Sequence, residues 1–283
     1  MNNVLITGAR GQLGSELKTI TSNNTSFYFT NKDELNITNI KSIEEYVIEN
    51  EIKTIINCAA YTAVDTAEKE KNLSNLINNI AVENLAKISK ERNLKLVHIS
   101  TDYVFDGNNY IPYNENDITN PKSQYGKTKL EGENAIININ PYNSIIIRTS
   151  WVYSTYGNNF VKTMCRLSKE KDKLGVICDQ IGTPTYAKDL ALVILKIIPL
   201  IENRKVEIYN YTNEGVASWY DFSKAIFERI NSDIIVEPIQ TSQYKTLAKR
   251  PYYSVLNKTK IKTKFNLSIP YWKDSLKECL NKI

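Results

Sequence analysis

The feature that most constrains the fold is a set of three glycines, spaced three residues apart, directly after a short apolar run. The run 4–7 predicts a strand, and the glycines are Gly8, Gly11 and Gly14. Glycines at these positions allow a tight turn, a close approach of the backbone to a pyrophosphate, and close packing of the next helix on the strand. The free N–H groups at the start of that helix favour phosphate. The pattern therefore predicts a dinucleotide-binding turn.

Short β-branched runs alternate with longer amphipathic stretches through the first half of the chain. We expect further strands over 26–30, 54–59, 94–100 and 144–148. We expect helices over 15–20, 40–50, 76–91 and 124–139. Apolar strands that alternate with helices predict a parallel sheet covered on both faces. Because crossovers between parallel strands are right-handed, the predicted fold class is α/β, a Rossmann-type doubly wound sheet.

Strands and helices alternate less regularly in the second half of the chain. Helices are expected at 159–170, 187–198 and 218–230, and strands at 174–178, 206–210 and 234–239. The length of 283 residues corresponds to nearly two domains of about 150 residues each. We predict a dinucleotide-binding domain over 1–150 and a smaller, mainly substrate-binding α/β domain over 151–283. One or two elements of the second part are expected to return to the first sheet.

Composition excludes several classes of protein. Hydrophobic residues make up 42% and charged residues 24%, as in soluble globular enzymes. No apolar run approaches the roughly 18 residues of a membrane-spanning helix, and the run 4–6 is too short for a signal peptide. The four cysteines are scattered without a CxxC pair, which argues against a zinc site and a disulfide framework. A cytoplasmic protein with reduced thiols is expected.

Charge is distributed unevenly along the chain. Residues 1–150 carry 15 basic and 18 acidic side chains, whereas 151–283 carry 21 and 13. Seven positive charges and no acid lie between Thr241 and Lys264. A basic half can indicate nucleic acid, a membrane surface or an anionic small molecule.

Three side chains are candidates for acid–base chemistry. Tyr125 and Lys129 are four residues apart near the start of a predicted helix, so they share one face. A free tyrosine has a pKa of about 10, and a nearby ammonium lowers it towards the working range. Thr101 follows the fourth predicted strand, at the sheet edge where α/β folds bind ligands. The single histidine, His98, lies in an apolar run, and we interpret it as buried and structural.

The end of the second predicted strand bears on the cofactor. An acid there would bond the ribose 2′-hydroxyl of NADH, whereas a base would favour the 2′-phosphate of NADPH. In this chain Lys32 precedes Asp33. The order favours NADPH and leaves NADH possible.

Together, these motifs resemble the extended short-chain dehydrogenases/reductases. The resemblance rests on the glycine run, the segment 100–107 with its sequence STDYVFDG, and the pair Tyr125 and Lys129. It narrows to the dTDP-4-dehydrorhamnose reductases through the segments 57–68, 148–153, 157–160, 179–185 and 250–251. It extends from about Val4 to Trp272, which is nearly the whole chain.

The resemblance implies NAD(P)H-dependent reduction of the 4-keto group of dTDP-4-dehydro-L-rhamnose to dTDP-L-rhamnose, in dTDP-rhamnose biosynthesis. Tyr125 would donate a proton to the carbonyl oxygen, and Thr101 would bond that oxygen. Lys129 would bond the nicotinamide ribose and lower the pKa of Tyr125. The glycine turn and the resemblance together give the cofactor-binding set Gly8, Gly11, Gln12, Leu13, Gly14, Asn36, Ile37, Ala60, Tyr61, Thr62, Tyr125 and Lys129. The substrate-binding set is Thr101, Asp102, Tyr103, Trp151 and Arg250.

Several points depart from the family pattern or remain open. Some members hold magnesium with a cluster of acids at a dimer contact, but Glu16 and Asp189 alone are too few, so no metal is expected. Thr62 and Asp65 could form a helix capping box, so Asp65 is not assigned to the site. The expected partner is a nucleotide sugar, with no nucleic acid or membrane, and the chain is a monomer or a homodimer.

If the substrate is a nucleotide sugar, we interpret the excess positive charge of residues 151–283 in two ways. Part of it would attract the anionic substrate, and the rest would lie on the solvated surface. Arg250 is the candidate contact of the substrate diphosphate. The lysines at 258, 260, 262 and 264 are expected on a solvated face.

Two alternative functions stay open. One is another sugar-nucleotide reductase, epimerase or dehydratase of the same superfamily. In dehydratases an Asp-Glu pair follows the threonine, whereas here Asp102 is followed by Tyr103. The other is a non-enzymatic regulatory subunit, as in the β-subunit of methionine adenosyltransferase. The presence of Thr101, Tyr125 and Lys129 argues against it.

Overall fold

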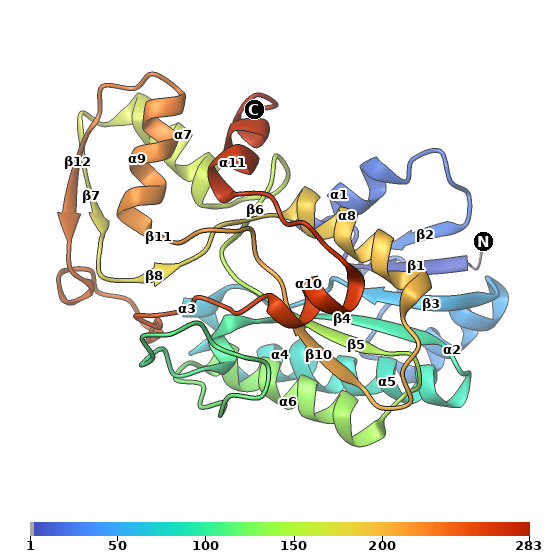
Figure 1. The fold of residues 1–283 in the computed structure, drawn as a ribbon. Coiled ribbons are helices and arrows are strands. Elements are labelled where there is room, and N and C mark those ends of the chain that lie inside the picture. Colours follow the sequence, from blue (N-terminus) through green and yellow to red (C-terminus); the bar gives the residue numbers. More distant parts are fainter. Residues whose placement is uncertain (1–2) are drawn as a thin grey trace.

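A six-stranded parallel sheet forms the centre of the molecule (Figure 1), which confirms the predicted α/β class. The computed structural model describes residues 3–283. The strand order is β10-β5-β4-β3-β1-β2. These strands are β1 (Asn3–Thr7), β2 (Phe27–Thr30), β3 (Ile52–Asn57), β4 (Lys95–Thr101), β5 (Ile145–Thr149) and β10 (Glu207–Asn210).

The order of strands reverses between β1 and β3. The chain first places β2 on one side of β1 and then places β3 on the other. In open α/β sheets a ligand crevice forms at such a switch point, at the carboxyl ends of the strands. Thr7 and Asn57 are register partners at the ends of β1 and β3. The glycine turn and the segment after Asn57 therefore leave the sheet side by side.

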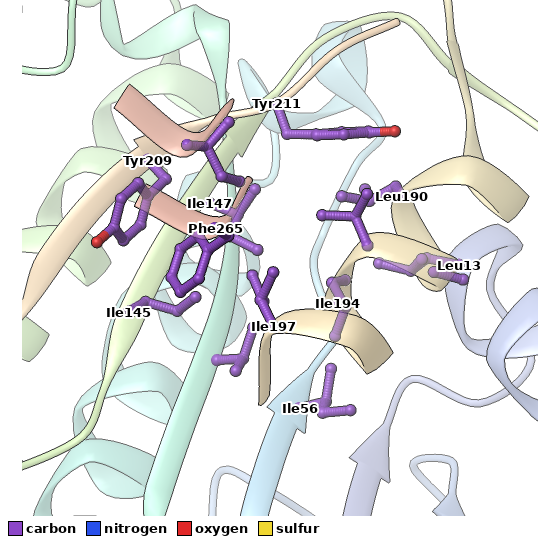
Figure 2. Close-up of a cluster of buried hydrophobic side chains, with 14 of the residues drawn as sticks. Leu13, Ile56, Ile145, Ile147, Leu190, Ile194, Ile197, Tyr209, Tyr211 and Phe265 are labelled. Atoms are coloured by element: carbon purple, nitrogen blue, oxygen red, sulfur yellow. The ribbon is translucent and has the colours of Figure 1, made fainter. Parts of the chain in front are cut away.

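Helices cover both faces of this sheet. One face is covered by α1 (Gln12–Ile20), α8 (Ala187–Ile197) and α10 (Thr259–Phe265). The other is covered by α2 (Ile40–Glu49), α5 (Ala81–Glu91) and α6 (Gln124–Ile139). Figure 2 shows Ile194 and Ile197 of α8 directed towards the strands that carry Ile56 and Ile145. Each fully buried aliphatic side chain of this kind stabilises the fold by about 1.5–3 kcal/mol.

The chain beyond β5 contributes to the sheet and also builds a second body of structure. β10 pairs with β5, and α8 packs against α1. The remaining helices are α7 (Phe160–Glu170), α9 (Trp219–Arg229) and α11 (Trp272–Leu280). The short strands are β6 (Val152–Tyr153), β7 (Lys173–Ile177), β8 (Ile181–Gly182), β9 (Thr185–Tyr186), β11 (Ala217–Ser218) and β12 (Ile235–Ile239). Their core is aromatic, with Tyr153, Tyr186, Phe222 and Trp272 buried together. The domain division at residue 150 stays a prediction.

The predicted helix over 76–91 differs from the structure. Short helices α3 (Val64–Ala67) and α4 (Lys71–Asn75) come first, and Leu76–Ile80 forms a π-helical turn before α5. Within that turn, the Asn78 amide accepts from the Tyr61 N–H and donates to the Tyr61 carbonyl oxygen. π-Helical turns of this kind occur frequently at functional sites. Helical periodicity did not reveal this turn, because the pattern of apolar residues is the same for one π-helical turn as for an α-helix over so short a segment.

The lysines near the C-terminus also differ from expectation. Lys258 is buried and lies 3.5 Å from a carboxylate oxygen of Glu214, with which Lys262 also pairs. Lys260 pairs with Glu207 of β10. These ion pairs dock α10 on its neighbours. The predicted solvated face is wrong for Lys258, whereas the paired side chains of Lys260 and Lys262 remain 36% and 43% exposed and Lys264 is exposed. No helix within residues 3–283 is long and apolar enough to cross a membrane.

A buried ion pair joins α6 to β5. Arg148 donates Nε and Nη2 hydrogen bonds to the Glu133 carboxylate, the shortest at 2.6 Å, and both side chains are at most 3% exposed. Ser100 of β4 also donates to Glu133. The Arg148 guanidinium donates further to the Glu115 carbonyl oxygen. The pair is therefore fully hydrogen-bonded on both sides.

Replacing Glu133 by alanine should destabilise the protein by about 3–5 kcal/mol, because Arg148 would remain buried without its counter-ion. Urea unfolding followed by circular dichroism measures the change. Glu131→Ala, two residues away on an exposed position of α6, is the matched control and should stay within about 0.5 kcal/mol of the parent. Equal effects of the two substitutions would contradict the assignment.

Candidate active site

Two cavities adjoin at the glycine turn. One, of about 440 Å³, lies at the carboxyl ends of β4 and β5. The other, of about 490 Å³, lies beside the ends of β1 and β2. Gly11, Cys58 and Ala60 line both cavities, so the two form parts of one groove. Predicted site residues that line the first are Gly11, Gln12, Leu13, Ala60, Thr62, Thr101, Asp102, Tyr103, Tyr125, Lys129 and Trp151. Those that line the second are Gly8, Gly11, Asn36, Ile37 and Ala60.

The glycine turn packs too tightly for side chains. Gly8 has φ +69°, and a Cβ there would lie 2.7 Å from the Ala59 backbone nitrogen. A Cβ on Gly14 would lie 2.5 Å from the Gly8 carbonyl oxygen. Helix α1 begins directly after Gly11, which has no side chain to cap it. Its first residues, Gln12 and Leu13, line the first cavity, and the helix start has no side-chain cap from Gly11, as an anion site requires.

Two cations lie at the end of the groove beside β2. Lys32 and Arg10 both line the second cavity, together with the predicted Asn36 and Ile37. Arg10 Nη1 lies 3.3 Å from Asp33 Oδ2, and both side chains are well exposed. Sequence reasoning assigned no role to Arg10. Its position between Gly8 and Gly11, inside the predicted phosphate-binding turn, could have indicated a role in cofactor binding.

Helix α6 brings the acid–base candidates to the first cavity. Its first turn is capped by Ser123, whose side chain accepts from the Gly126 N–H at 3.1 Å. A Cβ on Gly126 would lie only 2.3 Å from the Tyr103 carbonyl oxygen. The helix therefore rests directly on the 3-10 turn Asp102–Val104 that follows β4. As a result, Thr101, Tyr125 and Lys129 line one cavity.

The protonation states in this cavity are controlled mainly by burial. Burial raises the pKa of Tyr125 to about 12, although hydrogen bonding with Thr101 opposes the shift. Burial lowers the pKa of Lys129 to about 8, although electrostatic interactions with Glu133 and Cys58 raise it. Lys129 Nζ donates to the Ile99 carbonyl oxygen at 2.6 Å. The expectation that Lys129 lowers the pKa of Tyr125 stays a prediction; in this structure burial dominates and the Tyr125 pKa is raised.

Polar atoms without partners point to a ligand. Among residues 3–283, Gln12 Oε1, Asp102 Oδ2 and Thr149 Oγ1 are buried and have no hydrogen-bond partner. All three residues line the first cavity. Buried polar groups in native proteins are normally satisfied, so a polar ligand in this cavity would account for them. Thr149 was not predicted as a site residue, although it lies in the quoted segment 148–153.

Trp151 lines the cavity in a strained backbone conformation. Its φ is +49°, in the left-handed region that tryptophan rarely adopts. Its indole stacks on Trp219 of α9, with ring centroids 3.6 Å apart. A Cβ on Gly182 would lie 2.6 Å from the same indole. Contacts with Trp219 and Gly182 therefore fix the indole of Trp151, and the residue also lines the cavity.

Three predicted site residues do not line either cavity. Gly14 serves packing, as described above. The Tyr61 hydroxyl donates to Glu70 at 2.7 Å. Arg250 forms a two-point ion pair with Asp65, at 3.1 Å and 2.5 Å. The capping box between Thr62 and Asp65 is not formed, because Asp65 is taken by Arg250 and by the Ala248 N–H. The contact of Arg250 with a diphosphate stays a prediction.

The two acids considered for a metal have separate partners. Glu16 accepts from the Ser154 hydroxyl at 2.6 Å. Asp189 accepts from Asn213 and Ser275. In the part of the chain that the structure describes, no three His, Cys, Asp or Glu side chains are grouped so as to hold a metal ion.

Asp102 should make stability depend on pH. Burial raises its pKa from 3.8 to about 7. Because the pKa is raised in the folded state, its stabilising contribution is complete below about pH 4 and is lost as the pH rises to 7. The difference between the free energy of unfolding of the parent and that of Asp102→Asn should therefore decrease as the pH rises from 4 to 7, by at most about 1.4 kcal/mol per pH unit. Urea unfolding at several pH values measures it, and a flat difference would contradict a raised pKa.

Comparisons with known proteins agree along the whole chain. The family model described as RmlD substrate binding domain matches residues 1–283. The chain is 43% identical, over 98% of each sequence, to a dTDP-4-dehydrorhamnose reductase of Aggregatibacter actinomycetemcomitans. It shares 42% sequence identity with a dTDP-4-dehydrorhamnose reductase from Clostridium acetobutylicum, whose crystal structure matches this one with a TM-score of 0.94 over 99% of both chains. It is 40% identical to one from Bacillus anthracis in complex with NADP, with TM-score 0.95 over 100% of both.

Proposed function

Because the chain belongs to the dTDP-4-dehydrorhamnose reductase family, we propose that it reduces the 4-keto group of dTDP-4-dehydro-L-rhamnose to dTDP-L-rhamnose with NADPH. This is a step of dTDP-rhamnose biosynthesis. The observation that carries the proposal is that Thr101, Tyr125 and Lys129 line one cavity that adjoins the glycine-turn groove. The cytoplasmic location and the monomeric or homodimeric state stay predictions.

The groove fits a dinucleotide along its length. The uncapped start of α1 at Gly11, Gln12 and Leu13 suits the pyrophosphate, and Asn36 and Ile37 suit the adenine end. Lys32 and Arg10 provide positive charge for a 2′-phosphate. The unpartnered Gln12 oxygen lies on the same path. When bound, NADPH supplies the hydride that the substrate carbon receives.

The side chains of the first cavity supply the proton and stabilise the developing charge. With its pKa raised to about 12, Tyr125 is protonated at neutral pH and can donate to the carbonyl oxygen. Thr101, whose single hydroxyl hydrogen is donated to Asp102 Oδ1 at 2.9 Å in this structure, would turn that hydrogen to the same oxygen when the substrate binds. A donor placed in this way contributes about 3–4 kcal/mol to transition-state stabilisation. Because the side chains are preorganised by packing, little reorganisation is needed during the reaction.

The substrate end of the cavity is formed by Asp102, Tyr103 and Trp151. Burial raises the pKa of Asp102 to about 7, so part of the population carries a carboxyl O–H that can donate to a sugar hydroxyl. Trp151 adds apolar surface for a deoxysugar. We retain Arg250 as the diphosphate contact, since a guanidinium has five N–H donors and its pairing with Asp65 leaves some of them free.

A superfamily dehydratase or epimerase is the competing function. Both regenerate their cofactor in each cycle and consume no external NADPH. In this chain Tyr103 occupies the position at which dehydratases carry the second acid. The ring of Tyr103 also packs edge-on against the ring of Tyr125, and the ring centroids are 5.5 Å apart.

Tyr125→Phe should lose nearly all turnover while it still binds NADPH, because only the proton donor is removed. Thr101→Val should lower kcat by about 100- to 1000-fold. NADPH absorbance with dTDP-4-dehydro-L-rhamnose measures turnover, and fluorescence titration measures cofactor binding. Tyr110→Phe, on a tyrosine that is 88% exposed, is the control and should keep full activity. Turnover without stoichiometric NADPH oxidation would favour the competing function.

The preference for NADPH should depend on the two cations beside β2. Removing both charges in Arg10→Ser/Lys32→Ser should weaken NADPH binding about 10- to 100-fold, because two solvent-exposed charge pairs with a phosphate together contribute about 1.4–2.7 kcal/mol. NADH binding should change little, since NADH has no 2′-phosphate. Calorimetric titration with both cofactors tests this, and Lys53→Ser on the exposed side of β3 is the control. Equal losses for both cofactors would contradict the assignment.

A further inference from the structure

Two unpartnered polar atoms of the first cavity border the same segment of chain, 149–152. Within residues 3–283, Gln12 Oε1 and Thr149 Oγ1 are buried without a hydrogen-bond partner, and both residues line the first cavity. Thr149 is the last residue of β5 and is 5% exposed. Gln12 Nε2 donates to the carbonyl oxygen of Val152, three residues further along the chain, at 3.3 Å. The function proposed above assigns no bond to either atom.

The alternation of side chains along β5 directs Thr149 towards α1. Ile147 belongs to the core cluster under α1 and α8, whereas Arg148 reaches Glu133 of α6 on the other face of the sheet. Successive side chains of a strand point to opposite faces, so Thr149 shares the face of Ile147. Gln12 is the first residue of α1, which covers that face. The two unpartnered atoms therefore lie on one side of the sheet.

The two atoms differ in what they can bond. The Val152 carbonyl oxygen can only accept, so the nitrogen end of the Gln12 amide faces it and the oxygen end is left for a ligand. An amide oxygen accepts only, so it cannot bond a pyrophosphate oxygen, which also accepts only. The Thr149 hydroxyl can donate. A ligand group that matches both atoms carries an N–H or O–H donor next to an acceptor oxygen.

The position along the sheet indicates which part of NADPH reaches these atoms. With the adenine end beside β2 and the pyrophosphate beside β1, the nicotinamide is expected further along the strand order, at β4 and β5. Thr101 and Thr149 are register partners on these two strands, which lie about 4.8 Å apart. The ring carbon that gives the hydride must face the carbonyl beside Thr101, and the carboxamide is attached to the adjacent ring carbon. We therefore expect the carboxamide beside Thr149.

We propose that the side chains of Gln12 and Thr149 together bind the primary amide of the nicotinamide. The amide N–H2 donates to Gln12 Oε1, and Thr149 Oγ1 donates to the amide oxygen. The assignment rests on the proposed function, which places NADPH in this groove. It separates two roles within one residue, because the backbone of Gln12 stays at the pyrophosphate while its side chain reaches the nicotinamide.

The nicotinamide ribose carries the other donors in this half of the cofactor. The proposed function assigns the ribose hydroxyls to Lys129, which projects from α6 on the opposite face of the sheet from α1. The carboxamide is therefore the better match for an acceptor on the α1 side. Gln12 is also held in place before any ligand binds, by Val152 and by Gly157, where a Cβ would lie 3.3 Å from Gln12 Cγ.

A fixed carboxamide would control the orientation of the nicotinamide ring. Rotation of the ring about its glycosidic bond carries the carboxamide to the opposite edge and presents the other face of the ring to the substrate. Two bonds to the carboxamide oppose that rotation. The contacts of Gln12 and Thr149 would thus contribute to the positioning of the hydride as well as to affinity.

Cofactor analogues test the two halves of the contact separately. The reduced 3-acetylpyridine analogue of NADPH has a methyl group in place of the amide N–H2. The reduced thionicotinamide analogue has sulfur, a weaker acceptor, in place of the amide oxygen. Calorimetric titration of the full-length protein without substrate measures the dissociation constant of each cofactor.

Gln12→Met should weaken binding of NADPH about 5-fold more than binding of the acetylpyridine analogue, because only NADPH loses the bond from its N–H2. Thr149→Val should weaken binding of NADPH and of the acetylpyridine analogue alike, and binding of the thionicotinamide analogue less. Thr149→Ser keeps the hydroxyl and should bind NADPH as the parent does. The control ligand is 2′,5′-ADP, which has no nicotinamide and should bind parent and variants equally.

The comparison is made between cofactors on one variant, so a general disturbance of the groove cancels. If Gln12→Met and Thr149→Val weaken NADPH and both analogues to the same degree, the proposal is overturned. A purely structural role, or a bond to the ribose, would affect all three cofactors in the same way. Unchanged NADPH affinity in both variants would overturn it as well.

The two levels of inference fail separately. If the analogues bind as expected and the protein reduces no nucleotide sugar, the proposed function falls and the carboxamide site stands. If the sugar is reduced and the variants do not distinguish the cofactors, the reverse holds.

Discussion

The active site depends on how closely helix α6 approaches its neighbours. Two glycines make this approach possible, because a Cβ would lie 2.3 Å from the Tyr103 carbonyl oxygen at Gly126 and 2.2 Å from that of Asn78 at Gly132. The ion pair between Glu133 and Arg148 then holds the middle of the helix to the sheet. Tyr125 and Lys129 occupy the first two turns of this helix. Their positions relative to Thr101 therefore follow from backbone contacts rather than from flexible side chains.

The same close packing removes water from the reacting groups. Both Tyr125 and Lys129 are moved by burial towards their uncharged forms. Charge that forms on a substrate oxygen would then interact with fixed donors in a medium of low polarity, where each hydrogen bond is worth more than in water. Lys129 Nζ donates to the Ile99 carbonyl oxygen at 2.6 Å and lies 3.2 Å from His98 Nε2. Packing and electrostatics are thus two results of one arrangement.

Much of this arrangement could be predicted because it is local in sequence. The glycines at 8, 11 and 14 predict the phosphate turn, and the four-residue spacing of Tyr125 and Lys129 predicts a shared helix face. Strand β4 ends at Thr101, one residue beyond the predicted strand end. The π-helical turn at 76–80 did not follow from helical periodicity, and the side chain of Asn78 within it bonds to Tyr61 and to Thr128, 17 and 50 residues away.

The sequence by itself determined the alternation of strands and helices, the dinucleotide turn and the identity of the acid–base side chains. Each of these depends on residue type and short spacing. Only the tertiary structure decided that Arg250 pairs with Asp65, 185 residues away, and that Lys258 is buried against Glu214. It also decided that His98 lies 3.2 Å from Lys129 rather than in a purely apolar core. Such contacts depend on strand register and on the depth at which a helix packs, and neither is encoded in a local pattern of residues.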